Sequence, residues 1–194
     1  MSNVRIMKTQ RLFVVFGIAI CLLTSCGGSV KEQDRLVYLQ NSNLSSIPDS
    51  IFDKPHLEVL VLSNHGFIAP IGNSAFENGN SIFGVSEKIC TLKELKVLDL
   101  AFNQLSVLPS CIDDLQNLTE LDLSGNPNFD VHWLVPHILK LKKLKLLNLF
   151  GVRQAMAERE WLIEQLECLP LEIIITREEL LKKYSTIPLE KTGS

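Results

Sequence analysis

The sequence lacks the features that mark nucleic-acid-binding proteins and membrane-spanning proteins. No basic stripe and no arginine-rich segment appears, and the formal net charge is −3, so no nucleic-acid partner is expected. The apolar run near the N-terminus extends only from Leu12 to Leu23, whereas a membrane-spanning helix needs about 20 apolar residues. The run is therefore too short for an anchor helix and fits the core of a signal peptide.

The sequence also lacks the motifs of the common enzyme classes. It has no Gly-x-Ser-x-Gly, no phosphate-binding loop, no His-Glu-x-x-His and no dinucleotide fingerprint. Its carboxylates are scattered, whereas active sites gather polar groups at one place. We therefore expect a protein that is not an enzyme, with no catalytic residues and no cofactor.

The N-terminal segment has the layout of an exported precursor. Arg5, Lys8 and Arg11 precede the apolar run, and Leu23-Thr24-Ser25-Cys26 follows it. The last four residues resemble the lipobox of bacterial lipoproteins, in which the cysteine becomes the lipidated first residue of the mature protein. The resemblance implies a signal peptide at 1–25 and a lipidated Cys26 that opens a flexible tether at 26–33. An ordinary secretory signal with a chance cysteine is the alternative.

The lipoprotein resemblance also implies a location. Several acyl chains, palmitate among them, would anchor the protein firmly in the bacterial cell envelope. Gly27 and Gly28 follow the cysteine with no aspartate beside it, which by resemblance to bacterial sorting rules favours the outer membrane. The side of that membrane on which the domain lies is left open.

Leucines recur in a spacing that suits neither a helix nor a strand for long. The pattern L-x-x-L-x-L-x-x-N begins at Leu95 and begins again 23 residues later, at Leu118. Further units begin at Asp34, Leu57 and Leu144, which gives about five in all. This pattern resembles the leucine-rich repeat family in its 23-residue form.

The resemblance implies an α/β fold, a leucine-rich-repeat solenoid over residues 34–152. A curved parallel sheet would form the concave face, short helices or turns would form the convex face, and a helical cap would close the C-terminal end. Elementary energetics agrees with stacking, because one unit cannot offset the entropy of ordering its own backbone. The units must therefore share one continuous core.

Two asparagines occupy the same position in successive units. Asn103 and Asn126 follow the strand leucines, and in this family the side-chain amide is expected to bond the backbone of adjacent loops. An amide suits this role because it has both donors and acceptors. His65 and Val152 occupy the position in other units, so the ladder is expected to be imperfect there.

The segment after the repeats predicts a cap at 153–187 and a loose tail at 188–194. An amphipathic helix is expected at Gln154–Cys168 and a buried strand at Leu171–Ile175. Thr176 and Glu179 would then form a capping box for a short final helix. The inward face of the first helix would carry Trp161, Leu162, Leu166 and Leu169.

The outward positions of the strands would line the concave face, free of the core requirement. They form columns that are apolar toward the N-terminal side and acidic in the middle. An exposed apolar patch beside charge often marks a protein-binding surface. The predicted partner-binding residues are Leu36, Tyr38, Val59, Val61, Val97, Asp99, Glu120, Asp122, Leu146, Asn148 and Phe150.

A protein partner is the favoured hypothesis for this face. A β-rich surface also favours Val and Tyr for reasons of packing alone. The second hypothesis is a carbohydrate-binding or structural envelope lipoprotein. A glycan would find its aromatic and polar contacts at Tyr38, Asp99, Asp122 and Asn148.

An insertion and a cysteine pair leave alternatives open. The insertion at Ile68–Ser81 could carry binding function, or it could be a tolerated surface loop. Cys90 and Cys111 occupy neighbouring places in adjacent units. They could form a disulfide after export, or remain small free thiols in the convex layer. With Cys168, three cysteines follow Cys26, and an odd number cannot all pair within the chain.

Asp130, His132 and His137 come closest to a set of metal ligands. Paired histidine ligands need a regular helical spacing or a fixed carboxylate, and Pro136 interrupts this segment. We expect a surface loop here, with Trp133 packed on the convex side, and no metal.

Overall fold

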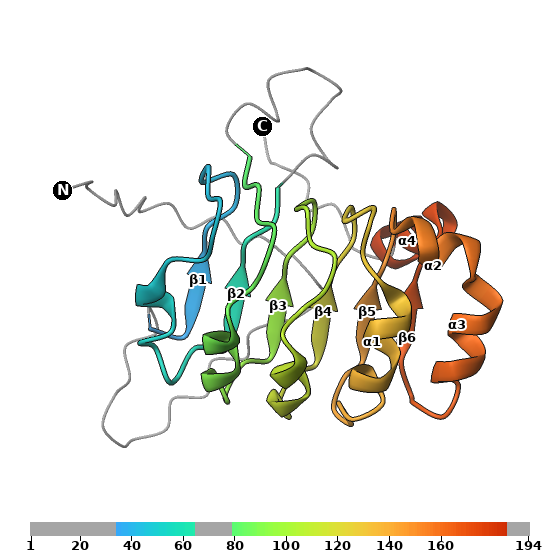
Figure 1. The fold of residues 1–194 in the computed structure, drawn as a ribbon. Helices are drawn as coiled ribbons and strands as arrows, with labels where there is room; N and C mark the ends of the chain where they lie inside the picture. The colour runs from blue at the N-terminus through green and yellow to red at the C-terminus, as the bar shows by residue number, and fades with distance from the viewer. Residues whose placement is uncertain (1–33, 65–78, 186–194) are drawn as a thin grey trace, which may run out of the picture.

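The chain folds into a solenoid whose strands form one parallel sheet (Figure 1). The computed structural model describes residues 34–64 and 79–185. Each strand pairs with its sequence neighbour, in the order β1-β2-β3-β4-β5-β6. The strands are β1 (Leu36–Tyr38), β2 (Val59–Val61), β3 (Val97–Asp99), β4 (Glu120–Asp122), β5 (Leu146–Asn148) and β6 (Glu172–Ile174).

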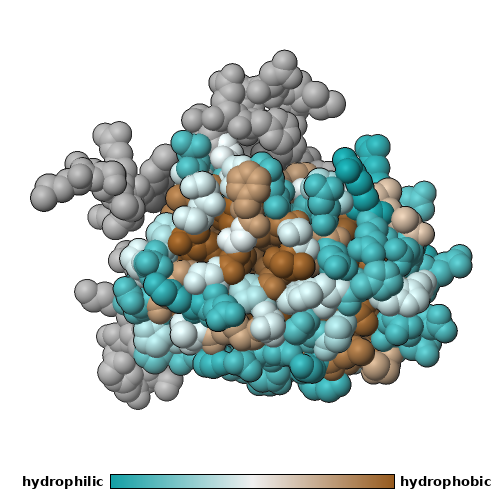
Figure 2. All heavy atoms as spheres, in the orientation of Figure 1, coloured by the Kyte–Doolittle hydropathy of each residue, from teal (hydrophilic) through white to brown (hydrophobic). Residues whose placement is uncertain are grey.

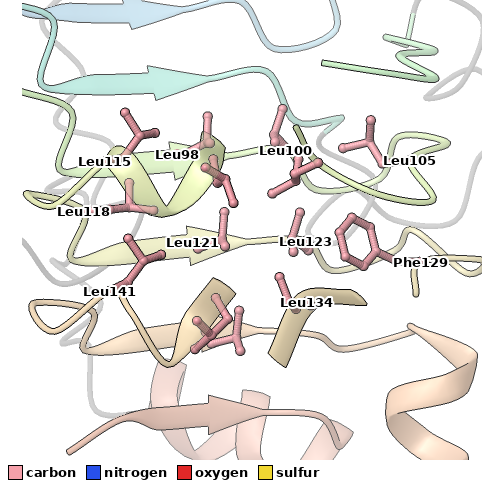
Figure 3. Close-up of a cluster of buried hydrophobic side chains, with 14 of the residues drawn as sticks. Leu98, Leu100, Leu105, Leu115, Leu118, Leu121, Leu123, Phe129, Leu134 and Leu141 are labelled. Carbon is pink, nitrogen blue, oxygen red and sulfur yellow. The ribbon is translucent and has the colours of Figure 1, made fainter. Parts of the chain in front are cut away.

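The register of the sheet places equivalent residues of successive units side by side. The middle residue of each strand points inward because side chains alternate along a strand. In register, these residues are Val37, Leu60, Leu98, Leu121, Leu147 and Ile173. Each repeat adds further leucines, such as Leu100 and Leu105, and all of them meet in one core that runs through the units (Figure 3).

Short helices return the chain on the side opposite the sheet's outer face. Three are 3-10 helices, η2 (Asp49–Ile51), η4 (Glu87–Thr91) and η5 (Ser110–Asp114). Pro48 and Pro109 precede two of them in extended conformation, which suits the start of a helix because proline has no N–H to leave unpaired. Seen from this convex side, apolar side chains gather near the middle of the face among hydrophilic ones (Figure 2).

The segment around the two histidines is a helix, so the predicted surface loop is wrong. Helix α1 (Val131–Ile138) starts at Asp130, whose Oδ1 accepts a hydrogen bond from the Trp133 N–H at 3.0 Å. This cap satisfies one of the free N–H groups at the helix start. Pro136 lies on the exposed side of the helix, where it does not disturb the core. The described residues contain no group of three or more potential metal ligands.

The C-terminal cap has two helices where the sequence predicts one. Helices α2 (Arg153–Ala157) and α3 (Arg159–Leu166) are separated at Glu158, whose ψ of 31° departs from helical geometry. The break allows the Glu158 carboxylate to meet His132 Nε2 of α1 at 2.7 Å. Leu162 and Leu166 are buried in the core as predicted, and Trp161 and Leu169 pack against it.

The last elements follow the sequence pattern closely. Strand β6 completes the sheet, and Thr176 and Glu179 form reciprocal hydrogen bonds before helix α4 (Arg177–Ser185). The Glu179 N–H donates to Thr176 Oγ1 at 3.2 Å, and the Thr176 N–H donates to Glu179 Oε2 at 2.9 Å. This is a capping box.

Buried asparagine amides join neighbouring coils. Asn126 is fully buried, and its Nδ2 donates to the Leu123 and Leu100 carbonyls at 2.9 and 3.1 Å. Its Oδ1 accepts the Leu105 N–H at 3.0 Å. Asn103 does the same one unit earlier, where its Oδ1 accepts the Ile82 N–H at 3.1 Å. Each amide therefore closes its own turn and holds the preceding unit.

Asn80 makes the ladder contacts that the repeat spacing assigns to His65. Its Nδ2 donates to the Leu39 and Leu62 carbonyls, both at 2.8 Å, and its Oδ1 accepts the Leu44 N–H at 3.0 Å. Asn80 and Ser81, which the sequence pattern places in the insertion, thus belong to the repeat. The chain's insertion comes before the ladder asparagine, not after it.

Cys90 and Cys111 form a disulfide between η4 and η5. Their Cα atoms are 5.9 Å apart, within the usual range for a disulfide. This settles the alternative between a disulfide and two free thiols. The bond ties the unit that carries the insertion to the unit that follows it, and Cys168 is free and exposed.

Several predicted segments lie outside the described residues. They are the signal peptide, Cys26 and the tether before residue 34, His65, most of the insertion, and the tail at 188–194. Among the helices of residues 34–64 and 79–185, none is long and apolar enough to cross a membrane.

Replacing Asn126 by alanine should strongly destabilise the solenoid. The change leaves the Leu105 N–H and several buried carbonyls without partners, which should cost about 2–4 kcal/mol in the free energy of unfolding. Urea denaturation would measure this. Asn128→Ala, at an exposed position two residues away, is the control and should change stability by less than about 0.5 kcal/mol. Equal effects of the two changes would contradict the ladder's role.

Removing the disulfide should also lower stability. Cys90 and Cys111 are 21 residues apart in sequence, and closing a loop of that length corresponds to about 3 kcal/mol. The variant Cys90→Ala/Cys111→Ala should show this loss in urea denaturation, and wild type should approach it in the presence of dithiothreitol. Cys168→Ser should behave like wild type under both conditions. A wild type that is insensitive to reductant would argue against the bond.

Candidate binding site on the concave face

The sheet brings the predicted partner-binding residues together in columns. The first column runs Leu36, Val59, Val97, Glu120 and Leu146, and the second runs Tyr38, Val61, Asp99, Asp122 and Asn148. Phe150 follows β5 at the next outward position. The register therefore places ten of the eleven residues on one face of the sheet, as the repeat spacing predicts, and Phe150 packs against the cluster of Val97 and Leu146 on the same face.

The exposure of these residues differs from the expected open surface. Tyr38 is 47% exposed, but Asp99 and Asp122 are only 2% and 5% exposed. The expectation of an accessible acidic patch is therefore wrong. Four other residues of the predicted site are also buried and not accessible as expected. They are Val61, Val97, Leu146 and Asn148. The most exposed residue of the predicted site is Tyr38 at its N-terminal end, and Leu36, Val59, Glu120 and Phe150 are half-buried.

Helix α4 accounts for part of this burial. Its Leu180 is 5% exposed and forms an apolar cluster with the outward residues Val97, Leu146 and Ile174. Figure 1 shows α4 on the opposite side of the sheet from α1. The helix therefore lies over the concave face at its C-terminal end.

A row of polar side chains crosses the middle of the face. Ser63 Oγ donates to Asp99 Oδ2 at 2.7 Å, and Asn148 Nδ2 donates to Asp122 Oδ2 at 2.9 Å. The other oxygen of each carboxyl group accepts a backbone hydrogen bond. The Ala101 N–H donates to Asp99 Oδ1 at 3.0 Å, and the Ser124 N–H donates to Asp122 Oδ1 at 2.8 Å. Each carboxyl group is thus held in a fixed orientation.

The two carboxyl groups share an environment that disfavours charge. Asp99 and Asp122 are partners in the register of β3 and β4. Burial raises the pKa of Asp99 to about 6, although the bonds from Ser63 and Ala101 oppose the rise. Burial and the neighbouring Asp99 carboxylate raise the pKa of Asp122 to about 7. Both effects are expected for adjacent carboxyl groups away from water.

Glu120 adds a third carboxyl group beside this pair. Burial raises its pKa, while the nearby Lys183 of α4 opposes the rise. Its Oε2 is buried and has no hydrogen-bond partner among the described residues. Lys145 is the second lysine whose charge lowers the pKa of Glu120.

The start of α4 is held more firmly than the rest. The Glu179 carboxylate accepts hydrogen bonds from Arg159 at 2.7 Å and from the Ile175 and Thr176 N–H groups at 2.8 and 2.9 Å. Although burial acts in the opposite direction, these bonds lower the pKa of Glu179 to about 2. Further along, Lys183 Nζ contacts Glu172 Oε2 at 2.5 Å.

Three residues of the face, Glu172, Leu180 and Lys183, are missing from the site predicted from sequence. Glu172 could have been found, because it continues an outward column of the repeat pattern. Leu180 and Lys183 could not, because the direction of a helix after the last strand is not encoded in the repeat spacing.

Comparison with protein families supports the repeat. Residues 78–127 match a family described as leucine rich repeat, and residues 117–141 match a second leucine rich repeat family. Together with the six-stranded parallel sheet, these matches show that the fold is an α/β leucine-rich-repeat solenoid. The predicted fold class is confirmed.

Individual relatives are much longer than this chain. Receptor-like protein 39 of Arabidopsis thaliana is 33% identical over 132 residues, which cover 60% of this chain and 15% of that protein. The chain spans 4–17% of the length of the curated relatives it matches.

Two solved structures are similar to this chain. One is a leucine-rich-repeat protein of Leptospira interrogans, with 22% identity, a TM-score of 0.44, and coverage of 77% of this chain and 34% of that chain. The other is the plant peptide hormone receptor RGFR1 in complex with RGF2. It has 25% identity and a TM-score of 0.43, and the match covers 67% of this chain and 18% of that chain.

The carboxyl pair should give stability an unusual pH dependence. Since both pKa values are raised above the ordinary 3.8, the folded chain holds protons that the unfolded chain has lost between about pH 4 and pH 7. The pair's contribution to the free energy of unfolding therefore falls as pH rises through that range. Asp122→Asn removes one titrating group, so its stability relative to wild type should rise between about pH 5 and pH 7.5.

Urea denaturation at the two pH values would measure this difference. Asp114→Asn is the matched control, because Asp114 is an exposed aspartate on the convex side. Its stability relative to wild type should be the same at both pH values. If Asp122→Asn behaved like this control, the assignment of a raised pKa to the pair would be wrong.

Proposed function

We propose that this protein is a membrane-anchored lipoprotein whose repeat domain binds another protein through the concave face. The observation that carries the proposal is the fold. Solenoids present an extended, rigid surface made of outward strand residues, and here that surface has an exposed Tyr38 at its N-terminal end. The absence of a recognisable enzyme motif in the sequence agrees with a binding role.

The accessible N-terminal end of the face is the best place for a first contact. Tyr38 is exposed, and Leu36 and Val59 beside it are partly exposed. Aromatic and aliphatic side chains of this kind are common anchors at protein interfaces. The buried Asp99 and Asp122 then shape the floor of the site and contribute indirectly.

The disulfide supports export. Disulfides persist in oxidising compartments and are rare in the cytosol. A bond between Cys90 and Cys111 therefore agrees with the signal peptide and with lipidation at Cys26. On this proposal the domain lies in the cell envelope, anchored to the outer membrane through the tether at 26–33.

Site-specific photo-crosslinking would test binding. A benzophenone amino acid at position 38 should give cross-linked products with a partner protein in intact cells. The same probe at Met156, which is 57% exposed on α2, should give few or none. Products from position 156 and not from position 38 would move binding away from the concave face, and glycan binding without any protein product would favour the carbohydrate hypothesis.

The anchor has an independent test. Labelled palmitate should enter the wild-type protein and should be absent from Cys26→Ser. Incorporation that survives this substitution would contradict lipidation at Cys26.

A further inference from the structure

We propose that α4 is an intramolecular ligand of the concave face, which a partner displaces with a helix of the same chemistry. This inference rests on the proposed protein-binding function and names the partner's recognition element. That element is an amphipathic helix with a leucine and, one turn later, a lysine or arginine. The geometry of α4 shows how such a helix is held.

The apolar part of the contact centres on Leu180. Among residues 177–183 of α4, whose side chains are described, Leu180 is the buried apolar one, and it packs with Val97, Leu146 and Ile174. The next residue, Leu181, is 55% exposed. A single leucine in a cluster of outward strand residues is a contact that another leucine can reproduce.

The charged part of the contact lies on the same side of the helix. Residues 180 and 183 are three apart, so they share one helical face. Lys183 contacts Glu172 at 2.5 Å and lies near Glu120. A helix that presents leucine and lysine in this order therefore matches both the apolar cluster and the carboxyl groups of Glu120 and Glu172, which alternate with Val97 and Leu146 in the same column.

The Glu120 carboxyl group can accept a hydrogen bond that α4 does not supply. Glu120 Oε2 is buried without a hydrogen-bond partner among the described residues. Leaving such an atom unpaired is unfavourable. A partner whose arginine or lysine reached this oxygen would gain an interaction that is missing in the closed arrangement, which favours exchange.

The anchoring of α4 is also unequal along its length. The first turn is fixed by the capping box and by the bond from Arg159 to Glu179. In the second half, the described contacts include Leu180 and an ion pair between Lys183 and Glu172, in which the Glu172 side chain is 49% exposed. Exposed ion pairs are weak. The helix can therefore leave the sheet while its start remains attached.

Charge reversal tests whether the ion pair holds α4 closed. Hydrogen exchange of the α4 amides in the full chain should be about tenfold faster in Lys183→Glu than in wild type. The double variant Glu172→Lys/Lys183→Glu should restore slow exchange because it rebuilds the pair in reverse. Lys142→Glu, outside α4, is the control for the change in net charge. Equal exchange in wild type and Lys183→Glu would overturn the proposal.

A peptide tests whether the vacated face accepts a helix of this chemistry. The probe is a fluorescent synthetic peptide with the sequence of residues 175–185. It should bind Leu180→Asp/Lys183→Glu at least tenfold more tightly than wild type, whose site is occupied. A peptide carrying both substitutions should not bind either protein. Equal binding to both proteins, or a dimer of the variant formed by exchange of α4, would overturn the inference.

The two proposals fail in different ways. If the protein has no partner at this face, the probe at position 38 gives no cross-linked product in wild type or in the opened variant, while exchange and peptide binding still respond. If α4 is a fixed part of the cap, cross-linking from position 38 persists and neither exchange nor peptide binding changes. Circular dichroism of each variant separates these outcomes from unfolding, and Lys183→Glu alone preserves the buried leucine.

Discussion

Buried asparagine amides set the distance between successive coils, and the rest of the molecule depends on this spacing. Asn80, Asn103 and Asn126 each bond the backbone of their own turn and that of a neighbouring unit. Because a buried backbone group without a partner is costly, the coils cannot slide along one another. The register of the sheet follows, and with it the columns of the concave face. A surface built this way is rigid, because its side chains stand on a frame that cannot shift by one residue.

The fixed register of the sheet brings together two carboxyl groups that would repel each other in a flexible chain. Asp99 and Asp122 are neighbours because β3 and β4 are in register, although two buried carboxyl groups repel when both are charged. Ser63 and Asn148 stabilise the outer oxygens of the pair. Helix α4 then shields the C-terminal part of the face with one leucine and one ion pair. The result is a face that is accessible at its N-terminal end, carries buried carboxyl groups in its middle and is covered by α4 toward its C-terminal end.

The sequence predicted the repeat and failed where contacts depend on non-repeating parts. Leucine spacing determines the inward residues of every strand, and the sequence alone therefore identifies Leu98 and Leu121 as core residues. The burial of Asp99 and Asp122 is different, because these carboxyl groups bond to side chains of other strands, Ser63 and Asn148, and the leucine spacing does not specify those contacts. Pro136 favours a loop when the sequence is read alone, but in the structure it lies on the solvent-facing side of helix α1. The disulfide was left open because spacing alone cannot show whether two cysteine side chains point toward each other.

Asn64 and Asn80 have a consequence for how this protein can vary. Asn64 Nδ2 donates to the Asn80 carbonyl at 2.5 Å, and the Asn80 N–H donates to Asn64 Oδ1. The two ends of the insertion are thus fastened to each other and to the frame, independently of the residues between them. The entropy of closing a loop grows only slowly with its length, by about 0.6 kcal/mol for each doubling. Natural variation and engineering can therefore lengthen, shorten or replace the intervening sequence as an exchangeable module, while the coils on either side keep their register.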